Sequence, residues 1–106
     1  MATTTAAGRL DAIAADMRRI ITQTDARYAH RKLLRGLELV LQRNGGQYRL
    51  ALGRTDGQPS DSEVEICIGA FGVPIGAEVQ RTVKERPGKT GTRTYHVAEL
   101  YWTETE

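Results

Sequence analysis

The chain has 106 residues, a hydrophobic fraction of 40% and a formal net charge of +2. This length predicts one domain over residues 1–106 with a single modest core. The single cysteine, Cys67, excludes an internal disulfide framework, and no apolar run is long enough to span a membrane. Residues 1–8 lack the basic and apolar parts of a signal peptide, so we expect a cytoplasmic protein without a membrane partner.

The basic residues are concentrated in the first half of the chain. Residues 1–54 contain 10 Lys/Arg and 4 Asp/Glu, whereas residues 55–106 contain 5 and 9. A basic surface attracts phosphate-bearing partners, so the position of each basic cluster along the chain matters.

An amphipathic helix is predicted over residues 8–24. Its apolar residues recur at steps of three and four, which places them on one stripe: Leu10, Ile13, Met17, Ile20 and Ile21. This stripe faces either the core or a dimer seam. Residues 1–6 are small and polar, and we expect them to be disordered.

The stretch "TDARYAHRKLLRG" predicts a second short helix, or a continuation of the first. Thr24 or Asp25 is a candidate cap, and Gly36 is a candidate end. On such a helix four residues would form one basic edge: Arg27, Arg31, Lys32 and Arg35.

Residues 37–53 predict a β-hairpin. Apolar and polar residues alternate on both sides of Asn44-Gly45, a pair that favours a tight turn, and Gly46 suggests a longer loop with a bulge. We expect Leu37, Leu39 and Leu41 to face the core.

Residues 60–71 fit both a helix and a strand by periodicity alone. The helix is favoured because Ser60 and Glu63 form a capping box, while Gly72 followed by Pro74 gives an end signal. In the strand alternative, Val64, Ile66 and Ile68 would share one face.

The last segment, up to Trp102, predicts a second hairpin with its turn near Pro87-Gly88. Its tip is basic, because five residues lie within a short stretch that contains one acid, Glu85: Arg81, Lys84, Arg86, Lys89 and Arg93. A basic hairpin can contact a nucleic-acid backbone, although a solvated charged loop is the simpler interpretation.

The tripeptide Gly88-Lys89-Thr90 matches the end of a phosphate-binding P-loop. In that motif another glycine precedes Gly88 by five residues, but position 83 is Val83. A P-loop also follows a buried strand and begins a helix, whereas a strand is predicted after residue 92. We therefore predict a hairpin tip and no nucleotide site.

The sequence contains no recognisable catalytic or metal-binding motif. His30, His96 and Cys67 are far apart, and Cys67 lies in an apolar run that is typical of the core. We therefore expect no catalytic residues, no metal and no cofactor.

Together these elements predict an α+β domain. An N-terminal helix and a helix between two antiparallel hairpins would cover one face of a single sheet. Two binding functions are consistent with this. One is nucleic-acid binding through the two basic clusters, should the fold bring them together, with Tyr28 and Tyr95 expected at the core edge. The other is protein interaction as a homodimer, through the helix stripe or the sheet edge near Tyr101 and Trp102.

Overall fold

The computed structural model describes residues 6–24, 27–32 and 36–103, and the predicted α+β class is confirmed. The elements, in chain order, are α1 (Ala6–Gln23), β1 (Tyr28–Lys32), β2 (Glu38–Asn44), β3 (Gln47–Arg54), α2 (Asp61–Phe71), β4 (Glu78–Gly88) and β5 (Gly91–Thr103). The expectation of disorder over residues 1–6 falls on residues outside this description, apart from Ala6, which begins α1.

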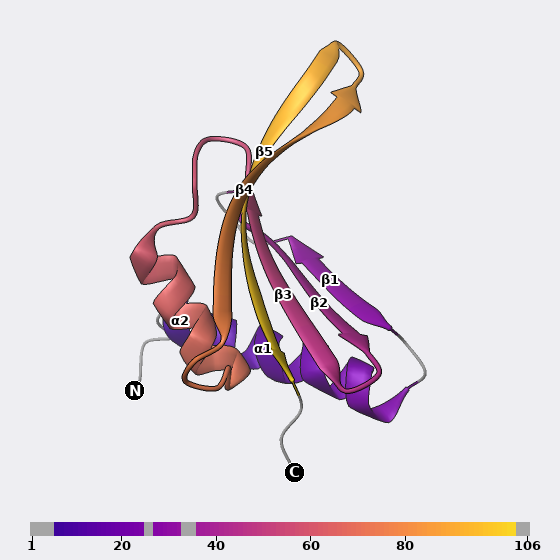
Figure 1. Cartoon of the computed structure of the whole chain (residues 1–106), viewed down its shortest axis with the longest axis vertical. Helices are drawn as coiled ribbons and strands as arrows, with labels where there is room; N and C mark the ends of the chain where they lie inside the picture. Colours follow the sequence, from indigo (N-terminus) through magenta and orange to yellow (C-terminus); the bar gives the residue numbers. More distant parts are fainter. Residues whose placement is uncertain (1–5, 25–26, 33–35, 104–106) are drawn as a thin grey trace.

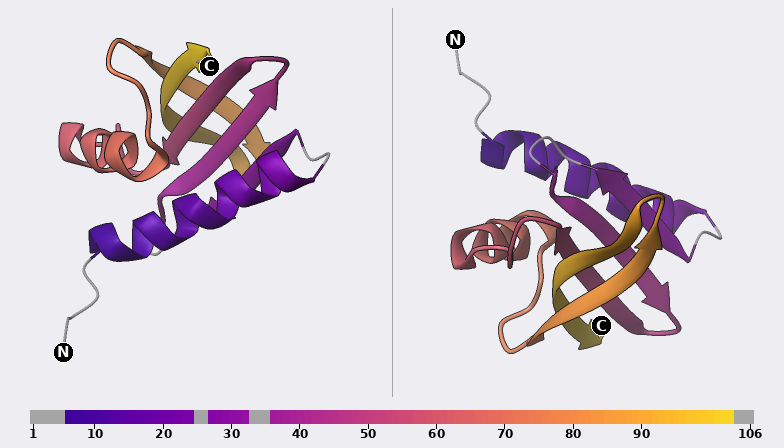
Figure 2. Two further views of the ribbon diagram at one scale, coloured as in Figure 1. Left: turned by 90° about the horizontal axis from the view of Figure 1, so that it is seen from below. Right: turned by 90° about the horizontal axis from the view of Figure 1, so that it is seen from above.

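The five strands form one antiparallel sheet in the order β1-β2-β3-β5-β4. Both predicted hairpins are confirmed as β2–β3 and β4–β5, and α2 connects them (Figure 1). Figure 2 shows α1 running along one side of the sheet. The edges of the sheet are β1 and β4. The sheet edge expected near Tyr101 and Trp102 is therefore wrong, because their strand, β5, lies between β3 and β4.

The core lies between the two helices and one face of the sheet. Alternate residues of the central strands are buried there, because successive side chains of a strand point to opposite faces. The sheet contributes Leu39, Leu41, Leu50, Leu52, Ala98 and Leu100, and the helices contribute Leu10, Ala14, Met17, Ile21, Val64, Cys67 and Phe71. The apolar stripe of α1 is therefore a core face, which excludes it as a dimer seam.

The helix predicted between residues 25 and 36 is wrong where the structure describes this segment. Residues 28–32 form the edge strand β1, which pairs with β2 from Tyr28 opposite Gln42 to Lys32 opposite Glu38. Pairing with β2 and contact with α1 outweigh the weak helical pattern of a short segment with one small buried residue, Ala29. A basic helical edge therefore does not exist at Arg27 and Arg31.

The turn between β2 and β3 is tighter than expected. Asn44 pairs directly with Gln47, and the ladder continues without interruption, so the predicted bulge is absent from this pair. Gly45 and Gly46 are the two turn residues, and Gly45 has a φ of 65°, which glycine adopts without steric cost. Leu37, Leu39 and Leu41 are buried as predicted.

The helical alternative for residues 60–71 is correct, and both of its end signals form. The Glu63 amide donates to Ser60 Oγ at 3.1 Å, and the Ser60 amide donates to Glu63 Oε1 at 3.0 Å. At the other end Gly72 adopts a left-handed φ of 64°, and the Val73 amide donates to the Ile68 carbonyl at 2.9 Å. Glu63 also bonds Arg54 of β3, which fixes α2 to the sheet.

The second hairpin is longer than the sheet to which it belongs. The β3–β5 pairing ends at Arg54 opposite His96, whereas β4 and β5 stay paired as far as Gly88 opposite Gly91. Residues 84–95 therefore form a two-stranded arm that projects from the sheet (Figure 1). Lys89 and Thr90 form its turn and are followed directly by strand β5, so the predicted hairpin tip at the P-loop-like tripeptide is confirmed.

Candidate nucleic-acid interface

The sheet face that lies opposite the helices is here named the open face. Residues directly opposite each other in neighbouring strands share a face, so the strand registers define its members. The central ones are Tyr28, His30 and Lys32 of β1, Glu38, Val40 and Gln42 of β2, Arg49, Ala51 and Gly53 of β3, Thr82, Lys84 and Arg86 of β4, and Arg93, Tyr95, Val97, Glu99 and Tyr101 of β5. Ala51 and Val97 are buried although they lie outside the main core cluster.

The fold brings part of the two predicted basic clusters together. Lys32 of β1 and Arg93 of β5 line one hollow of about 160 Å³ at the base of the arm. Lys84 and Arg86 of β4 line an adjoining hollow of about 180 Å³, and Tyr95 borders both. Four residues predicted from separate parts of the sequence thus share the open face.

Within the arm, two arginines are cross-strand neighbours. Arg86 of β4 lies directly opposite Arg93 of β5. The guanidinium carbon of Arg86 lies 5.4 Å from the ring centroid of Tyr95, which is within the range of a cation–π contact. Tyr95 therefore orients Arg86 without neutralising its charge.

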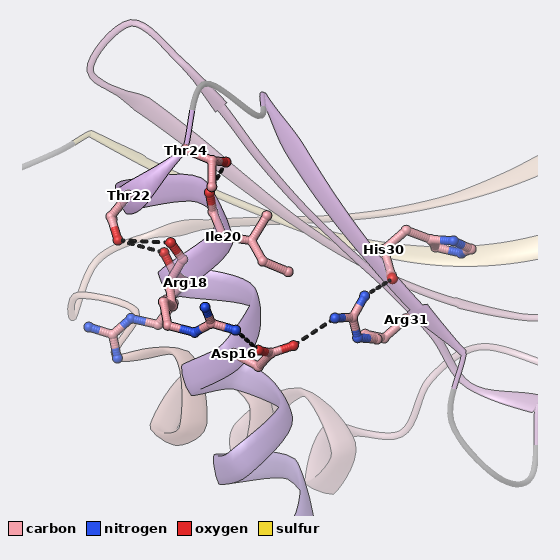
Figure 3. Close-up of polar contacts among 8 residues, drawn as sticks. Asp16, Arg18, Ile20, Thr22, Thr24, His30 and Arg31 are labelled. Atoms are coloured by element: carbon pink, nitrogen blue, oxygen red, sulfur yellow. Dashed lines mark hydrogen bonds and ion pairs between the residues drawn. The ribbon is translucent and has the colours of Figure 1, made fainter.

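Two predicted residues lie on the other face and hold the fold together. Arg31 Nη2 lies 2.6 Å from Asp16 Oδ2 of α1, and Figure 3 shows this contact together with the His30 ring pointing the opposite way. Arg81 Nη2 lies 2.8 Å from Asp61 Oδ1 of α2. Arg81 also donates to the Pro59 carbonyl at 2.6 Å. We therefore remove Arg31 and Arg81 from the candidate interface.

The remaining predicted residues are spread out. Arg27 lines a separate hollow of about 360 Å³ at the end of the sheet away from the arm, together with Arg43 and Arg49. Lys89 is exposed in the arm's turn. Arg35 lies outside the described residues.

A buried carboxylate that the sequence did not reveal lies at the centre of the open face. Glu99 is 5% exposed, and its Oε2 accepts from Arg49 Nε at 2.5 Å and from Tyr101 Oη at 2.7 Å. Its Oε1 lies 3.4 Å from Thr82 Oγ1 and 3.7 Å from Lys84 Nζ. Strand alternation places Glu99 on the same face as Val97, but only the register of β5 against β3 supplies its partner, Arg49.

The pKa values of this pair favour the charged forms. Burial raises the pKa of Glu99, but the hydrogen bonds from Tyr101 and Arg49 outweigh it and hold that pKa below its ordinary value. Burial likewise lowers the pKa of Arg49, but the hydrogen bonds and electrostatic attraction from Glu99 and Tyr101 together outweigh it, so the net change is upward. Glu99 therefore neutralises mainly Arg49, whereas the more distant Lys84 has a side chain that is 41% exposed.

The other carboxylate among the central members of the open face is Glu38. Its Oε1 lies 3.3 Å from His30 Nε2 and 3.7 Å from Lys32 Nζ. The Lys32 side chain is nevertheless 76% exposed, so the pair is open to solvent and is weakened by salt. Basic side chains therefore predominate where the arm joins the sheet.

The two tyrosines near the basic clusters differ in exposure. Tyr95 is partly buried at the base of the arm, but it lies on the open face and does not pack against the core cluster, so its predicted place at the core edge is wrong. Tyr28 is 61% exposed on the edge strand, so its predicted place at the core edge is wrong. Because β1 is a strand, Tyr28 belongs to the open face with Gln42 and Arg49.

The part of the chain that the structure describes does not support a metal site, a reactive cysteine or a membrane-spanning helix. Within residues 6–24, 27–32 and 36–103, no group of three or more His, Cys, Asp or Glu side chains is arranged to hold a metal ion. Cys67 is buried in the core as expected, and burial raises the pKa of its thiol to about 12, with a smaller effect from Glu63. None of the described helices is long and apolar enough to cross a membrane.

Comparisons of the chain with protein-family models, with curated proteins and with solved structures returned no match.

Proposed function

We propose that the open face binds nucleic acid through its phosphate groups and that the protein acts by binding, without catalysing a reaction. The observation that carries this proposal is the arrangement of Lys32, Lys84, Arg86 and Arg93 around two adjoining hollows. Arginine and lysine side chains on one face are the usual contacts to a phosphate backbone.

The pairing of Arg86 with Arg93 supports this proposal. Like charges directly opposite in an antiparallel pair destabilise it, so folding alone does not favour two arginines there. A phosphate between the two guanidinium groups would remove the repulsion through charge-assisted hydrogen bonds.

Charge reversal tests the proposal. Labelled oligonucleotide is titrated with wild-type protein and with Arg86→Glu, and anisotropy is recorded. Arg18→Glu is the matched control, because Arg18 is exposed on α1 and the substitution changes the net charge equally. We expect Arg86→Glu to weaken binding at least about tenfold, as for the loss of a charge-assisted contact, and Arg18→Glu to leave it nearly unchanged. Equal losses in both variants would contradict a defined interface.

As a second candidate we propose self-association at the opposite end of β5. A hollow of about 630 Å³ lies there between the loop that follows α2 and the strand ends, and it is lined by Ile75, Tyr101 and Trp102. The Ile75 side chain is fully exposed, and Trp102 stacks on Tyr48 with ring centroids 5.4 Å apart. Exposed apolar surface of this kind supports a protein contact.

Sedimentation velocity over a range of concentrations tests the second candidate. We expect a dimer whose stability changes little with salt and which Ile75→Asp dissociates. A wild-type protein that stays monomeric at all concentrations would exclude it and would leave the nucleic-acid proposal unaffected.

A further inference from the structure

The hollow beside Arg86 has an apolar floor made by small residues. Ala51 and Gly53 are the open-face residues of β3 there, and Val40 and Val97 lie beside them on the neighbouring strands. Its volume of about 180 Å³ is below the roughly 300–1,000 Å³ of sites that enclose a whole small molecule. The hollow therefore suits one flat group of a larger ligand.

Gly53 has no structural reason to be glycine. It is paired on both sides, with Glu38 and with Val97, and it is not among the residues with positive φ. A Cβ atom added there would meet only Glu38 Cβ, at 3.9 Å, which is an ordinary contact. Glycine inside a strand weakens it, and it often marks a place where a ligand approaches the backbone closely.

The rim of the same hollow carries groups that suit a nucleobase. The Tyr95 ring lies on the side of the arm beneath Arg86, and Gln42 lies on the side of β2. Gln42 Oε1 accepts from Arg49 Nη1 at 2.8 Å, which orients its amide. An aromatic ring for stacking beside an oriented amide is typical of sites that bind unpaired bases.

From this arrangement we infer that the ligand of the open face is a single-stranded nucleic acid, one base of which enters the hollow above Ala51 and Gly53. The inference rests on the proposed function, because the phosphates of that strand would be held by Lys84, Arg86 and Arg93. In a duplex the bases are stacked and paired, so none is available to fill the hollow.

The test compares three labelled ligands of equal length: a single strand, the same strand with abasic sites and a duplex. Wild-type protein should bind the single strand about tenfold more tightly than the abasic strand, as expected for one stacked base, and more tightly than the duplex. Gly53→Val fills the hollow without backbone strain and introduces a residue that favours strands. It should therefore remain folded and bind the single strand and the abasic strand equally.

Two further variants make the result decisive. Ala51→Val fills the same hollow from the other open-face position of β3. It tests for the base site if Gly53→Val does not fold. Gly69→Ala is the control: it adds a side chain on α2, outside the hollow, where an added Cβ meets nothing within 4 Å, and it should leave all three affinities unchanged.

Three outcomes would overturn the inference. If wild-type protein bound the single strand and the abasic strand equally while Arg86→Glu still abolished binding, the base would play no part and the phosphate proposal would stand. If no ligand bound even at low salt, the inference of a base site and the proposal of phosphate binding would both be wrong. Retention of the preference for the single strand in a folded Gly53→Val variant would likewise exclude the hollow as the base site.

Discussion

Arg86 and Arg93 lie directly opposite each other in the β4–β5 pair, on the open face, which holds no residue of the main core cluster. Their neighbours on this face, Lys84 and Tyr95, are also directly opposite each other. The base of the arm thus carries three cations around one aromatic ring. This arrangement suits anion binding better than it suits the stability of the hairpin.

Replacement of one arginine should separate stability from binding. In Arg93→Glu the new carboxylate lies opposite Arg86, so we expect the free energy of unfolding to rise by about 0.2–1 kcal/mol, as for an opposite-charge pair. The same change should weaken nucleic-acid binding. Urea denaturation and anisotropy measure the two effects, and Arg93→Gln should give an intermediate result in both. Lower stability in Arg93→Glu would show that the repulsion inferred here is not significant.

The N-terminal cap of α2 should make a measurable contribution to stability. Ser60→Ala removes the oxygen that accepts from the Glu63 amide, and a lost cap of this kind costs about 0.5–2 kcal/mol. Ser62→Ala is the control, because Ser62 is an exposed residue of α2, and surface changes are usually within about 0.5 kcal/mol. Alanine is the better helix former, so similar losses in both variants would mean that the cap at Ser60 is not the cause of the effect.

Stability should fall in acid. Hydrogen bonds from arginine lower the pKa of Asp16 and of Glu63, and the pKa of Glu99 is also lowered because its bonds outweigh its burial. A carboxyl group with a lowered folded-state pKa stabilises the fold above its unfolded pKa, and this contribution is lost as pH falls through the folded value. We therefore expect the free energy of unfolding to be flat near neutrality and to drop below about pH 4.

Urea denaturation at a series of pH values from neutral to about pH 3 measures this dependence, with reversibility checked at each pH. Glu63→Gln should lower stability at neutral pH and reduce the fall in acid, because one of the titrating groups is removed. A wild-type stability that stayed constant or increased towards low pH would contradict the assigned directions of the pKa shifts.

Cys67 should be unreactive in the folded protein. Its thiol is fully buried and has a pKa raised to about 12, so almost no thiolate exists near neutral pH. A colorimetric disulfide reagent should react with it far more slowly in buffer than in denaturant. Because this is the single cysteine of the chain, the signal needs no deconvolution. Equal rates in both solvents would show that the core around α2 opens readily.

Local signals were sufficient to predict most of the fold. The capping box at Ser60 and the glycine end signal at Gly72 decided between helix and strand for α2, because both act within one helical turn. The glycine pair and the alternation of leucines likewise predicted β2 and β3 as the two strands of a hairpin. Strand β1 was missed because an edge strand with one buried residue, Ala29, carries almost no periodic signal.

The candidate site could be predicted only in part, because some of its contacts join elements that are far apart in the sequence. Charge clustering along the chain is sufficient to propose Lys84, Arg86 and Arg93 as candidates, since they belong to one hairpin. It could not distinguish them from Arg81, whose ion pair with Asp61 depends on where α2 packs. The Glu99–Arg49 pair joins β5 to β3 and was invisible for the same reason. Residues that meet through sheet register leave little trace in a single sequence.

The salt dependence of binding is the most direct test of phosphate binding by the open face. Affinity for a labelled single strand is measured at several salt concentrations, and log K is plotted against log salt. Each phosphate contact contributes about −0.7 to the slope for single strands, so contacts from Lys32, Lys84, Arg86 and Arg93 predict a slope of about −3. A steep slope near this value that becomes shallower in Arg86→Glu would support the open face as a phosphate-binding surface. Binding that is absent, or that does not change with salt, would contradict it.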